Sequence, residues 1–228
     1  MMAKQIKQAV ILLSGGLDST VVLSECSKLG FEIHAMAFDY GQRHKLELKF
    51  ARWQANHFRC KSFKIFKIDL YGGSALTDNI QVPNHKDVNE IPNSIPNTYV
   101  PSRNIIFLSF ASGYAEFLNV NNIFIGVNSV DYSGYPDCRI EFIQQFEKLI
   151  NFSTKKGLEK NKFKIQTPLI KMTKKEIVLL GYKNGVDFLK TSSCYNPKKG
   201  EICKQCDSCL LRKKGFDEAN IEDPKWSA

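Results

Sequence analysis

No stretch of the sequence approaches the roughly 18 consecutive apolar residues that a membrane-spanning helix needs. Internal repeats and low-complexity tracts are also absent, which argues against solenoid and fibrous architectures. The first apolar run, at residues 9–13, follows Lys4 and Lys7, but it is too short for the core of a signal peptide, and no small-residue cleavage site follows it. We therefore expect a cytoplasmic protein that makes no membrane contact.

No arginine-rich or aromatic–basic motif accompanies the net charge of +9, although all of this excess lies in the last third of the chain. Residues 1–147 carry 14 Lys or Arg and 14 Asp or Glu, whereas residues 148–228 carry 18 and 9. Such a segment can attract nucleic acid or anionic small molecules, or its lysines can simply form a solvated surface. Without a nucleic-acid motif, we do not expect a nucleic-acid partner.

The alternation of strand and helix signals predicts an α/β fold. The 228 residues suffice for one domain with a substantial core. Apolar runs of strand length alternate with helical patterns, which indicates a parallel sheet with helices on both faces and ligands beyond the carboxyl ends of the strands. Residues 70–101, with four prolines, form too long a connection to be passive and are expected to be a lid or a substrate loop. The predicted strands are 9–13, 33–38, 63–68 and 123–127, and the predicted helices are 17–29, 44–58, 104–118, 140–152, 173–180 and 208–219.

The first predicted strand leads directly into the string SGGLDST at residues 14–20. Adjacent glycines let the backbone turn tightly and bring its N–H groups close to an anion at the start of a helix. A Walker loop would need a lysine before its Ser/Thr, and a dinucleotide loop would need a third glycine, and neither is present. The string instead resembles the pyrophosphatase loop of enzymes that split ATP between its α and β phosphates; the alternative is a capped strand-to-helix turn. We assign the nucleotide to Leu13, Ser14, Gly15, Gly16, Leu17, Asp18, Ser19, Thr20, Val21, Val22 and Leu23.

Four of the seven cysteines gather near the end of the chain in the spacing C-x8-C-x2-C-x2-C. Stable disulfides are not expected in a cytoplasmic protein. Four thiolates in a loop suit one structural zinc ion per chain, although an iron–sulfur cluster or redox chemistry remains an alternative. The predicted ligands are Cys194, Cys203, Cys206 and Cys209.

Further strings extend the resemblance along almost the whole chain, and together they are similar to the 7-cyano-7-deazaguanine synthase family of queuosine and deazapurine biosynthesis. Ser102 departs from the smaller residue usual at that position, which puts only local loop packing in doubt. The resemblance implies an ATP pyrophosphatase-type, Rossmann-like α/β domain over residues 1–190 and a zinc-binding subdomain over 191–228 packed on it. The strings are SGGLDST, FDYGQRHKLE (38–47), YVPSRNIIFLSFA (99–111), GVNSVDYSGYPDCR (126–139), TPLIKMTKKEI (167–177) and TSSCYN with CKQCDSCLLRKKGF (191–216).

The same resemblance implies a reaction and a set of roles. The family converts 7-carboxy-7-deazaguanine and ammonia to the nitrile by two successive adenylations, first of the acid and then of the amide, with Mg²⁺ and ATP, as a homodimer. Asp18 is then the magnesium residue, and Arg103 and Lys171 are candidates for further positive charge. A polar turn after the fourth strand is the expected substrate pocket, unless it merely connects two elements; its residues are Asp131, Tyr132, Tyr135, Asp137 and Arg139.

Two other classes of protein share part of these signals. A tRNA-modifying, thiolase-like ATP pyrophosphatase would also have the loop and a cysteine cluster, but it would need an RNA-binding domain and a sulfur-carrying cysteine, for which only Cys138 is available. A non-catalytic nucleotide-binding or zinc-binding module would not need the polar turn. Release of AMP in the presence of substrate separates these cases.

Overall fold

The computed structural model describes residues 7–92, 94–128, 134–159, 162–198 and 200–227. These residues form a five-stranded parallel sheet in the order β3-β2-β1-β4-β5. The central strand pairs on both sides, so that Ile11 lies opposite Ala35 on one neighbour and Phe124 on the other. The strands are β1 (Gln8–Leu12), β2 (Glu32–Asp39), β3 (Ser62–Lys67), β4 (Asn122–Phe124) and β5 (Lys164–Gln166).

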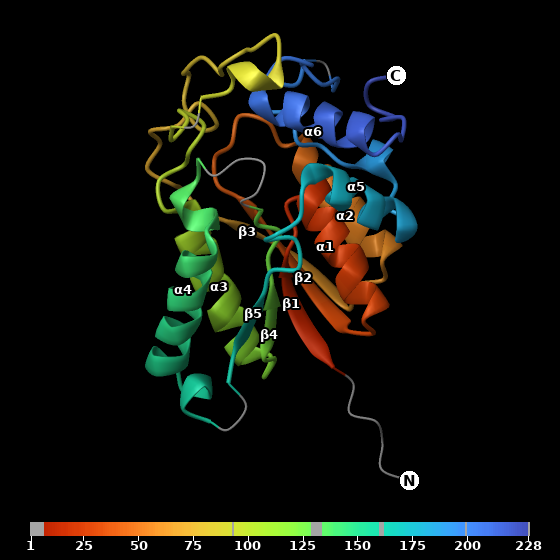
Figure 1. Ribbon diagram of the computed structural model, residues 1–228. Coiled ribbons are helices and arrows are strands. Elements are labelled where there is room, and N and C mark those ends of the chain that lie inside the picture. The colour runs from red at the N-terminus through yellow and green to blue at the C-terminus, as the bar shows by residue number, and fades with distance from the viewer. Residues whose placement is uncertain (1–6, 93, 129–133, 160–161, 199, 228) are drawn as a thin grey trace.

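Helices cover both faces of this sheet (Figure 1), as the sequence predicts. Helices α3 and α4 lie on one face, α1, α2 and α5 lie on the other, and α6 crosses above the carboxyl ends of the strands. Four short 3-10 turns, at residues 88–90, 136–138, 156–158 and 188–190, complete the described elements. The helices are α1 (Leu17–Lys28), α2 (Leu46–His57), α3 (Arg103–Phe117), α4 (Ile140–Ser153), α5 (Lys174–Lys183) and α6 (Asp207–Glu218).

The apolar residues of β1 explain why both faces are covered. Because successive side chains of a strand point to opposite faces, Ala9 and Ile11 pack into the core beneath α1 and α2, and Val10 and Leu12 pack into the core beneath α3 and α4. All four are buried, Leu12 at 8% exposure and the others at 0%. A continuous apolar run of this kind is typical of a parallel strand that is covered on both sides.

The six predicted helices and four predicted strands are confirmed, with bounds that differ by a few residues. Strand β5 was not predicted. It is only three residues long, and Ile165 is its one buried residue, so it has too few positions to establish an alternating pattern.

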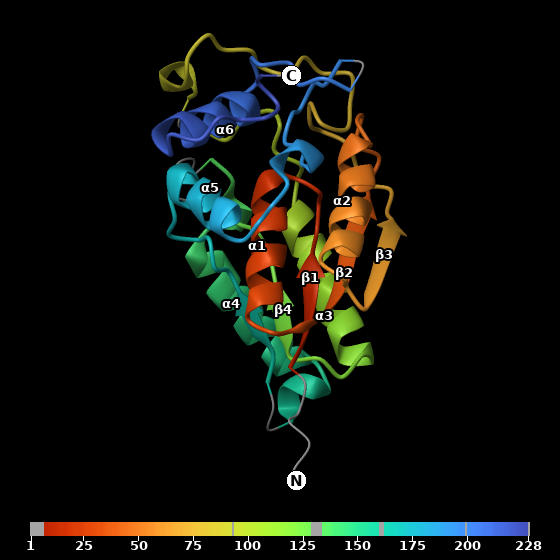
Figure 2. The same ribbon diagram turned by 90° about the vertical axis from the view of Figure 1, so that its right-hand side faces the viewer.

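The strand order reverses direction between β1 and β4, which makes their carboxyl ends the expected place for a ligand. Helix α6 and the irregular segment 70–101 lie above this edge (Figures 1 and 2). The segment contacts the cysteine region through a 2.9 Å hydrogen bond from the His85 backbone N–H to the Gln205 carbonyl. Its role as a lid or substrate loop stays a prediction.

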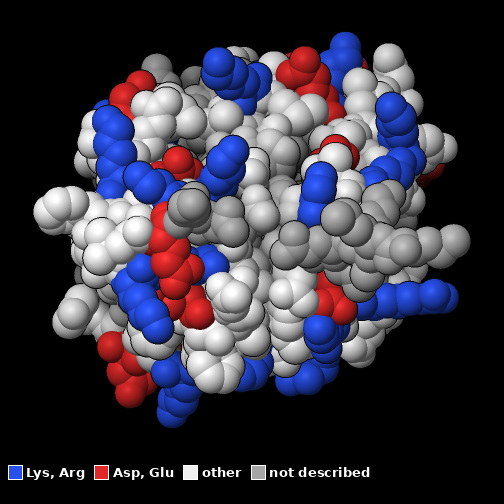
Figure 3. All heavy atoms as spheres, turned by 90° about the horizontal axis from the view of Figure 1, so that it is seen from below, with Lys and Arg blue, Asp and Glu red and all other residues white. Residues whose placement is uncertain are grey.

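The opposite end of the molecule carries charged side chains of both signs. Figure 3 shows Lys and Arg side chains interspersed with Asp and Glu over this face, rather than gathered in one basic stripe. Among the described residues, no helix is both long enough and apolar enough to cross a membrane.

Candidate functional site

The loop between β1 and α1 is fixed by its own side chains and by its neighbours. Gly16 caps α1, and its carbonyl accepts hydrogen bonds from the Thr20 N–H at 3.2 Å and the Thr20 hydroxyl at 2.8 Å. The Ser14 and Ser19 hydroxyls lie 2.9 Å apart. Gly15 adopts a φ of +84°, which favours glycine. The loop therefore presents the amino end of α1 to the carboxyl edge of the sheet, where the helix dipole favours an anion.

Replacing Gly15 with Ala is expected to destabilise the protein and weaken ATP binding. A Cβ atom at this position would lie 2.1 Å from the Glu47 carbonyl oxygen and 2.6 Å from the Ala51 nitrogen, so the loop would have to move away from α2. Gly30→Ala is the matched control, because its φ of +76° imposes the same strain, about 1–2 kcal/mol, with no atom within 4 Å. Urea unfolding measures the free energy of unfolding of each variant, and nucleotide titration measures its affinity for ATP. Equal losses in the two variants would contradict the proposed packing of Gly15 against α2.

A hollow of about 270 Å³ opens beside this loop. Its walls come from the loop, the carboxyl ends of β1 and β2, the start of α3, and the segment after β4. A smaller hollow of about 180 Å³ adjoins it and shares Asp18 and Arg103. Of the residues assigned to the nucleotide, those that line the larger hollow are Leu13, Ser14, Gly16, Leu17, Asp18 and Ser19. Thr20, Val21, Val22 and Leu23 are instead buried in α1.

The carboxylate of Asp18 is paired with a lysine that the sequence analysis did not assign to the site. The Lys174 ammonium donates to both Asp18 oxygens at 2.8 Å, and both residues line the smaller hollow. Lys171 is exposed and lines neither hollow. Lys174 is the first residue of α5, whereas Lys171 precedes that helix, and no local rule chooses between the two lysines from sequence.

Arg103 reaches both hollows from the first turn of α3. Its guanidinium lies 5.9 Å from the ring centre of Tyr40, the residue that follows β2, and this distance suits a cation–π contact. The arginine is therefore a fixed positive charge at the junction of the two hollows.

The residues predicted to bind the substrate do not all line a hollow, as the prediction of one pocket would require. Asp131 and Tyr132 lie outside the described residues. Tyr135 lines the smaller hollow, and its hydroxyl contacts those of Thr98 at 2.8 Å and Tyr195 at 3.3 Å. Asp137 and Arg139 line neither hollow.

Asp137 is buried and Arg139 is exposed, and each lies next to the start of a helix. The buried Asp137 carboxylate accepts a hydrogen bond from the Asn104 N–H at 3.0 Å, which orients the first turn of α3. Arg139 is exposed and immediately precedes α4.

Residues 191–196, from the C-terminal part of the chain, contact the loop between β1 and α1. The Ser192 N–H donates to the Gly15 carbonyl at 2.9 Å, and the Ser193 hydroxyl accepts from the Leu17 N–H at 3.3 Å. Tyr195 lines both hollows. The sequence analysis quoted this segment as part of the resemblance and assigned only its cysteine to a site, and the neighbouring serines and tyrosine were the available signal.

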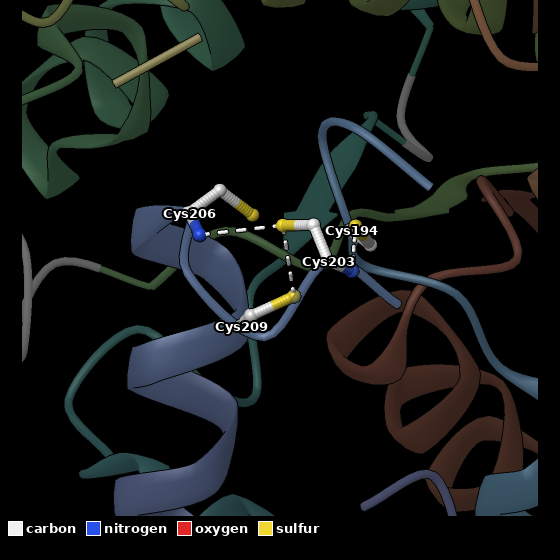
Figure 4. A group of neighbouring side chains, drawn as sticks. All are labelled: Cys194, Cys203, Cys206 and Cys209. Carbon is white, nitrogen blue, oxygen red and sulfur yellow. Dashed lines mark hydrogen bonds between the residues drawn. The ribbon is translucent and has the colours of Figure 1, made fainter. Parts of the chain in front are cut away.

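The four C-terminal cysteines converge on one point (Figure 4), and their sulfur atoms all lie within 4.8 Å of one another. The Cys203 and Cys209 sulfurs are 3.9 Å apart, close to the spacing that four sulfurs at about 2.3 Å from a zinc ion would have. Backbone N–H groups point at three of the sulfurs: Cys203 N–H at Cys194 (3.2 Å), Cys206 N–H at Cys203 (3.3 Å) and Tyr195 N–H at Cys206 (3.5 Å). Donors of this kind stabilise thiolates, so the cluster fits a metal ion.

The sequence of the chain is similar to one known family along most of its length. The family model described as "Queuosine biosynthesis protein QueC" matches residues 8–220. A 7-cyano-7-deazaguanine synthase from Desulfatibacillum aliphaticivorans is 51% identical, with 98% of each chain covered. One from Rickettsia akari is 49% identical over 96% of this chain and 98% of its own.

Solved structures extend the likeness to the fold alone. NMN synthetase from Francisella tularensis superposes with a TM-score of 0.50 at 16% identity, covering 96% of this chain and 74% of that one. The fold is the parallel α/β fold with helices on both faces that the sequence predicts.

Proposed function

The chain belongs to the QueC family of queuosine biosynthesis proteins, and we propose that it converts 7-carboxy-7-deazaguanine and ammonia to 7-cyano-7-deazaguanine with ATP. It is an ATP-dependent enzyme, and identity of about half its residues to synthases of this name along nearly the full length carries the assignment. The substrate carboxylate is a poor electrophile because it is anionic and resonance-stabilised. Adenylation provides a leaving group, ammonia then gives the amide, and a second adenylation on the amide oxygen leads to the nitrile.

The loop and its charged neighbours supply the positioning that such a reaction needs. The amino end of α1 and the Ser14 and Ser19 hydroxyls would hold the phosphates, and Arg103 and Lys174 would offset their charge. Asp18 would hold Mg²⁺, since a carboxylate facing the hollow is a suitable ligand and already binds a cationic group there. When bound, this ion would neutralise charge on the phosphates.

The smaller hollow is our proposed site for the deazapurine. Tyr135 and Tyr195 offer rings for stacking, and Arg103 offers a forked donor for the substrate carboxylate. Asp131 and Tyr132, in the string that follows β4, stay candidates for the polar edge of the base.

We propose that the cysteine cluster holds one structural zinc ion per chain. Four thiolates leave no open coordination position, so the metal would stabilise the subdomain 191–228 rather than take part in the reaction.

We also propose a cytoplasmic homodimer. Exposed apolar side chains at the ends of α3 and α4 and in the 3-10 turn after α4 support a dimer, namely Phe117, Phe152 and Leu158, each more than three-quarters exposed. The 3-10 turn that carries Leu158 lies beside α3, because the Lys156 N–H donates to the Glu116 carboxylate at 2.9 Å.

The thiolase-like alternative has less support. Cys138 is the cysteine that lines the hollows, and burial raises the pKa of its thiol to about 12. A thiol of this pKa stays protonated at neutral pH and is a poor sulfur carrier.

Isotope transfer tests the proposed route. With 7-carboxy-7-deazaguanine labelled with ¹⁸O in its carboxylate, we expect one labelled oxygen in AMP from each adenylation, because each C–O bond breaks after the oxygen has joined phosphorus. Mass spectrometry of AMP, pyrophosphate and phosphate measures this. Label in inorganic phosphate, accompanied by ADP, would contradict adenylation and indicate phosphorylation. Omission of ammonia is the control and should prevent nitrile formation.

A further inference from the structure

The proposed reaction requires a group that removes protons from nitrogen. Ammonia attacks the adenylated carboxyl carbon, a C–N bond forms, the C–O bond to AMP breaks, and the nitrogen must pass its surplus proton to a base. In the second half, the adenylated amide loses its remaining N–H protons as the second AMP departs. The nitrile nitrogen carries no hydrogen, so a base is needed in both halves.

Few ionisable groups in the hollows are suited to this task. Asp18 is paired with Lys174. Burial raises the pKa of Tyr40 and of Cys138 to about 12, and it also raises the pKa of the other two tyrosines that line the hollows. These hydroxyl and thiol groups stay protonated near pH 7 and cannot accept a proton. Among the residues that the structure describes, the other carboxylate in the lining of the larger hollow is that of Glu47.

Glu47 is held beside the phosphate loop by both its backbone and its side chain. It lies in the first turn of α2, against which Gly15 packs so closely that a Cβ atom there would meet the Glu47 carbonyl oxygen at 2.1 Å. The Gln42 amide donates to Glu47 Oε1 at 3.1 Å. Gln42 is itself fixed, because its oxygen accepts from the Tyr40 N–H at 2.7 Å and its nitrogen donates to the Phe38 carbonyl at 3.0 Å.

The surroundings of Glu47 also adjust its proton affinity. Burial raises the pKa of the Glu47 carboxyl to about 7, against the opposing effects of Arg103 and Gln42, which lower it. The ionisable groups that face it are Arg103 from α3 and Tyr40 after β2. The Glu47 side chain is half-buried and lines the hollow, and the hydrogen bond that Gln42 donates to it goes to Oε1. A base of this kind is half-protonated near the working pH, which suits repeated proton transfer.

We propose that Glu47 is the general base that takes protons from the reacting nitrogen, and that Gln42 is the positioning residue that holds its carboxylate toward the hollow. The proposal deepens the proposed function and rests on it. Each proton passes from nitrogen to Glu47 and then to water before the next transfer.

Substitution Glu47→Gln is expected to slow amide formation while leaving adenylation intact. Ammonium chloride is the probe, and kcat/KM is calculated for the concentration of free ammonia. This value should fall by about 10²- to 10⁴-fold, which is the usual effect of losing a general base. The wild-type value should decrease as pH falls through about 7, and the variant should lack this dependence. Exchange of labelled pyrophosphate into ATP, driven by 7-carboxy-7-deazaguanine without ammonia, should stay at the wild-type rate.

Hydroxylamine provides a second probe of the same step. It is a strong nucleophile that is unprotonated near neutral pH, and its adduct is acidic enough to lose a proton to water, so it should form the hydroxamate equally well with wild-type protein and the Glu47→Gln variant. Glu47→Asp should keep the pH dependence with a partial loss of rate. Gln42→Leu should move the dependence to higher pH, because the hydrogen bond from Gln42 lowers the Glu47 pKa. Glu141→Gln, at an exposed position in α4, is the matched control and should behave as wild type.

Thermal unfolding separates a role in the reaction from a role in folding. A carboxyl whose folded-state pKa lies above its unfolded value of 4.5 stabilises the protein less as pH rises toward 7. Glu47→Gln should therefore unfold at a higher temperature than wild type at pH 8 and show no such gain at pH 4. Equal losses in pyrophosphate exchange and amide formation, or unchanged amide formation, would overturn the role of Glu47. Absence of substrate-driven exchange in the wild-type protein would instead overturn the proposed function.

Discussion

Substitution Asp18→Asn is expected to lower turnover by about 10²-fold or more while the fold is retained. The carboxylate faces the smaller hollow beside the amino end of α1, where a magnesium ion on the phosphates would meet it, and a neutral amide oxygen is a much weaker ligand. The fold should survive, since the substitution keeps the shape of the side chain and leaves an oxygen that can still accept from the Lys174 ammonium. Steady-state kinetics over a magnesium titration, together with a melting curve, measure both effects.

Lys174→Met is the matched control for this substitution, because it breaks the same ion pair and leaves the carboxylate in place. We expect it to raise KM for ATP without changing the magnesium concentration that gives half-maximal rate, whereas Asp18→Asn should raise that concentration. Identical magnesium profiles for the two variants would mean that Asp18 acts only as the partner of Lys174. Near-normal turnover in Asp18→Asn would remove the residue from the site altogether.

The parts of the site that could be predicted from sequence are those made by neighbouring residues. The loop at 14–20 depends on a strand, two glycines and a helix start that follow one another directly, and the structure places them together. The cysteines are similar, since C-x2-C-x2-C keeps three sulfurs within one loop and one helical turn. In both cases the spacing of the residues in the sequence was enough to predict that they lie together.

Other site residues depend on contacts between distant segments, and no local pattern reveals them. Lys174 meets Asp18 across 156 positions, and Ser193 meets Leu17 across 176. Lysines 171 and 174 have the same chemistry, and Lys174 lines the smaller hollow whereas Lys171 does not. Asp137 was predicted as a substrate residue, and in the structure its carboxylate accepts a hydrogen bond from the Asn104 N–H at the start of α3, a contact that no sequence pattern reveals.

Glu47 shows why burial is the hardest property to predict from sequence. In the sequence it is one acidic residue in a charged helix start, the usual setting of a solvated side chain. Its raised pKa follows from the walls of the hollow, which come from β1, β2 and α3. Those walls exist only once the sheet has formed.

Substitution Cys206→Ser is expected to cost the protein its metal and much of its stability. A serine hydroxyl replaces a thiolate poorly at a tetrahedral site, and binding of a structural zinc contributes several kcal/mol to folding. At about 2–4 °C per kcal/mol for a chain of this size, the melting temperature should fall by about 10 °C or more. Metal analysis of the wild-type protein should give about one zinc per chain, and the variant should give much less.

The structure indicates which segments would lose stability with the metal. Cys206 and Cys209 pack against Ala75 and Val82, so the cluster holds segment 70–101 as well as the start of α6. The other end of α6 is anchored separately, because Phe216 lies in the main core. Loss of metal should therefore expose segment 70–101 and the start of α6 to proteolysis before the rest of the domain unfolds.

Cys60→Ser provides the control, since this cysteine is partly buried, lies between α2 and β3, packs against the main core and is not part of the cluster. It should keep its zinc and melt close to wild type. Chelation of the wild-type protein should reproduce the Cys206→Ser phenotype, and activity should fall only as the folded fraction falls, because four thiolates leave the metal no position for a substrate. Iron and sulfide in the purified protein would contradict a zinc site. Removal of the metal with unchanged stability and lost activity would show that the cluster serves the reaction and not the fold.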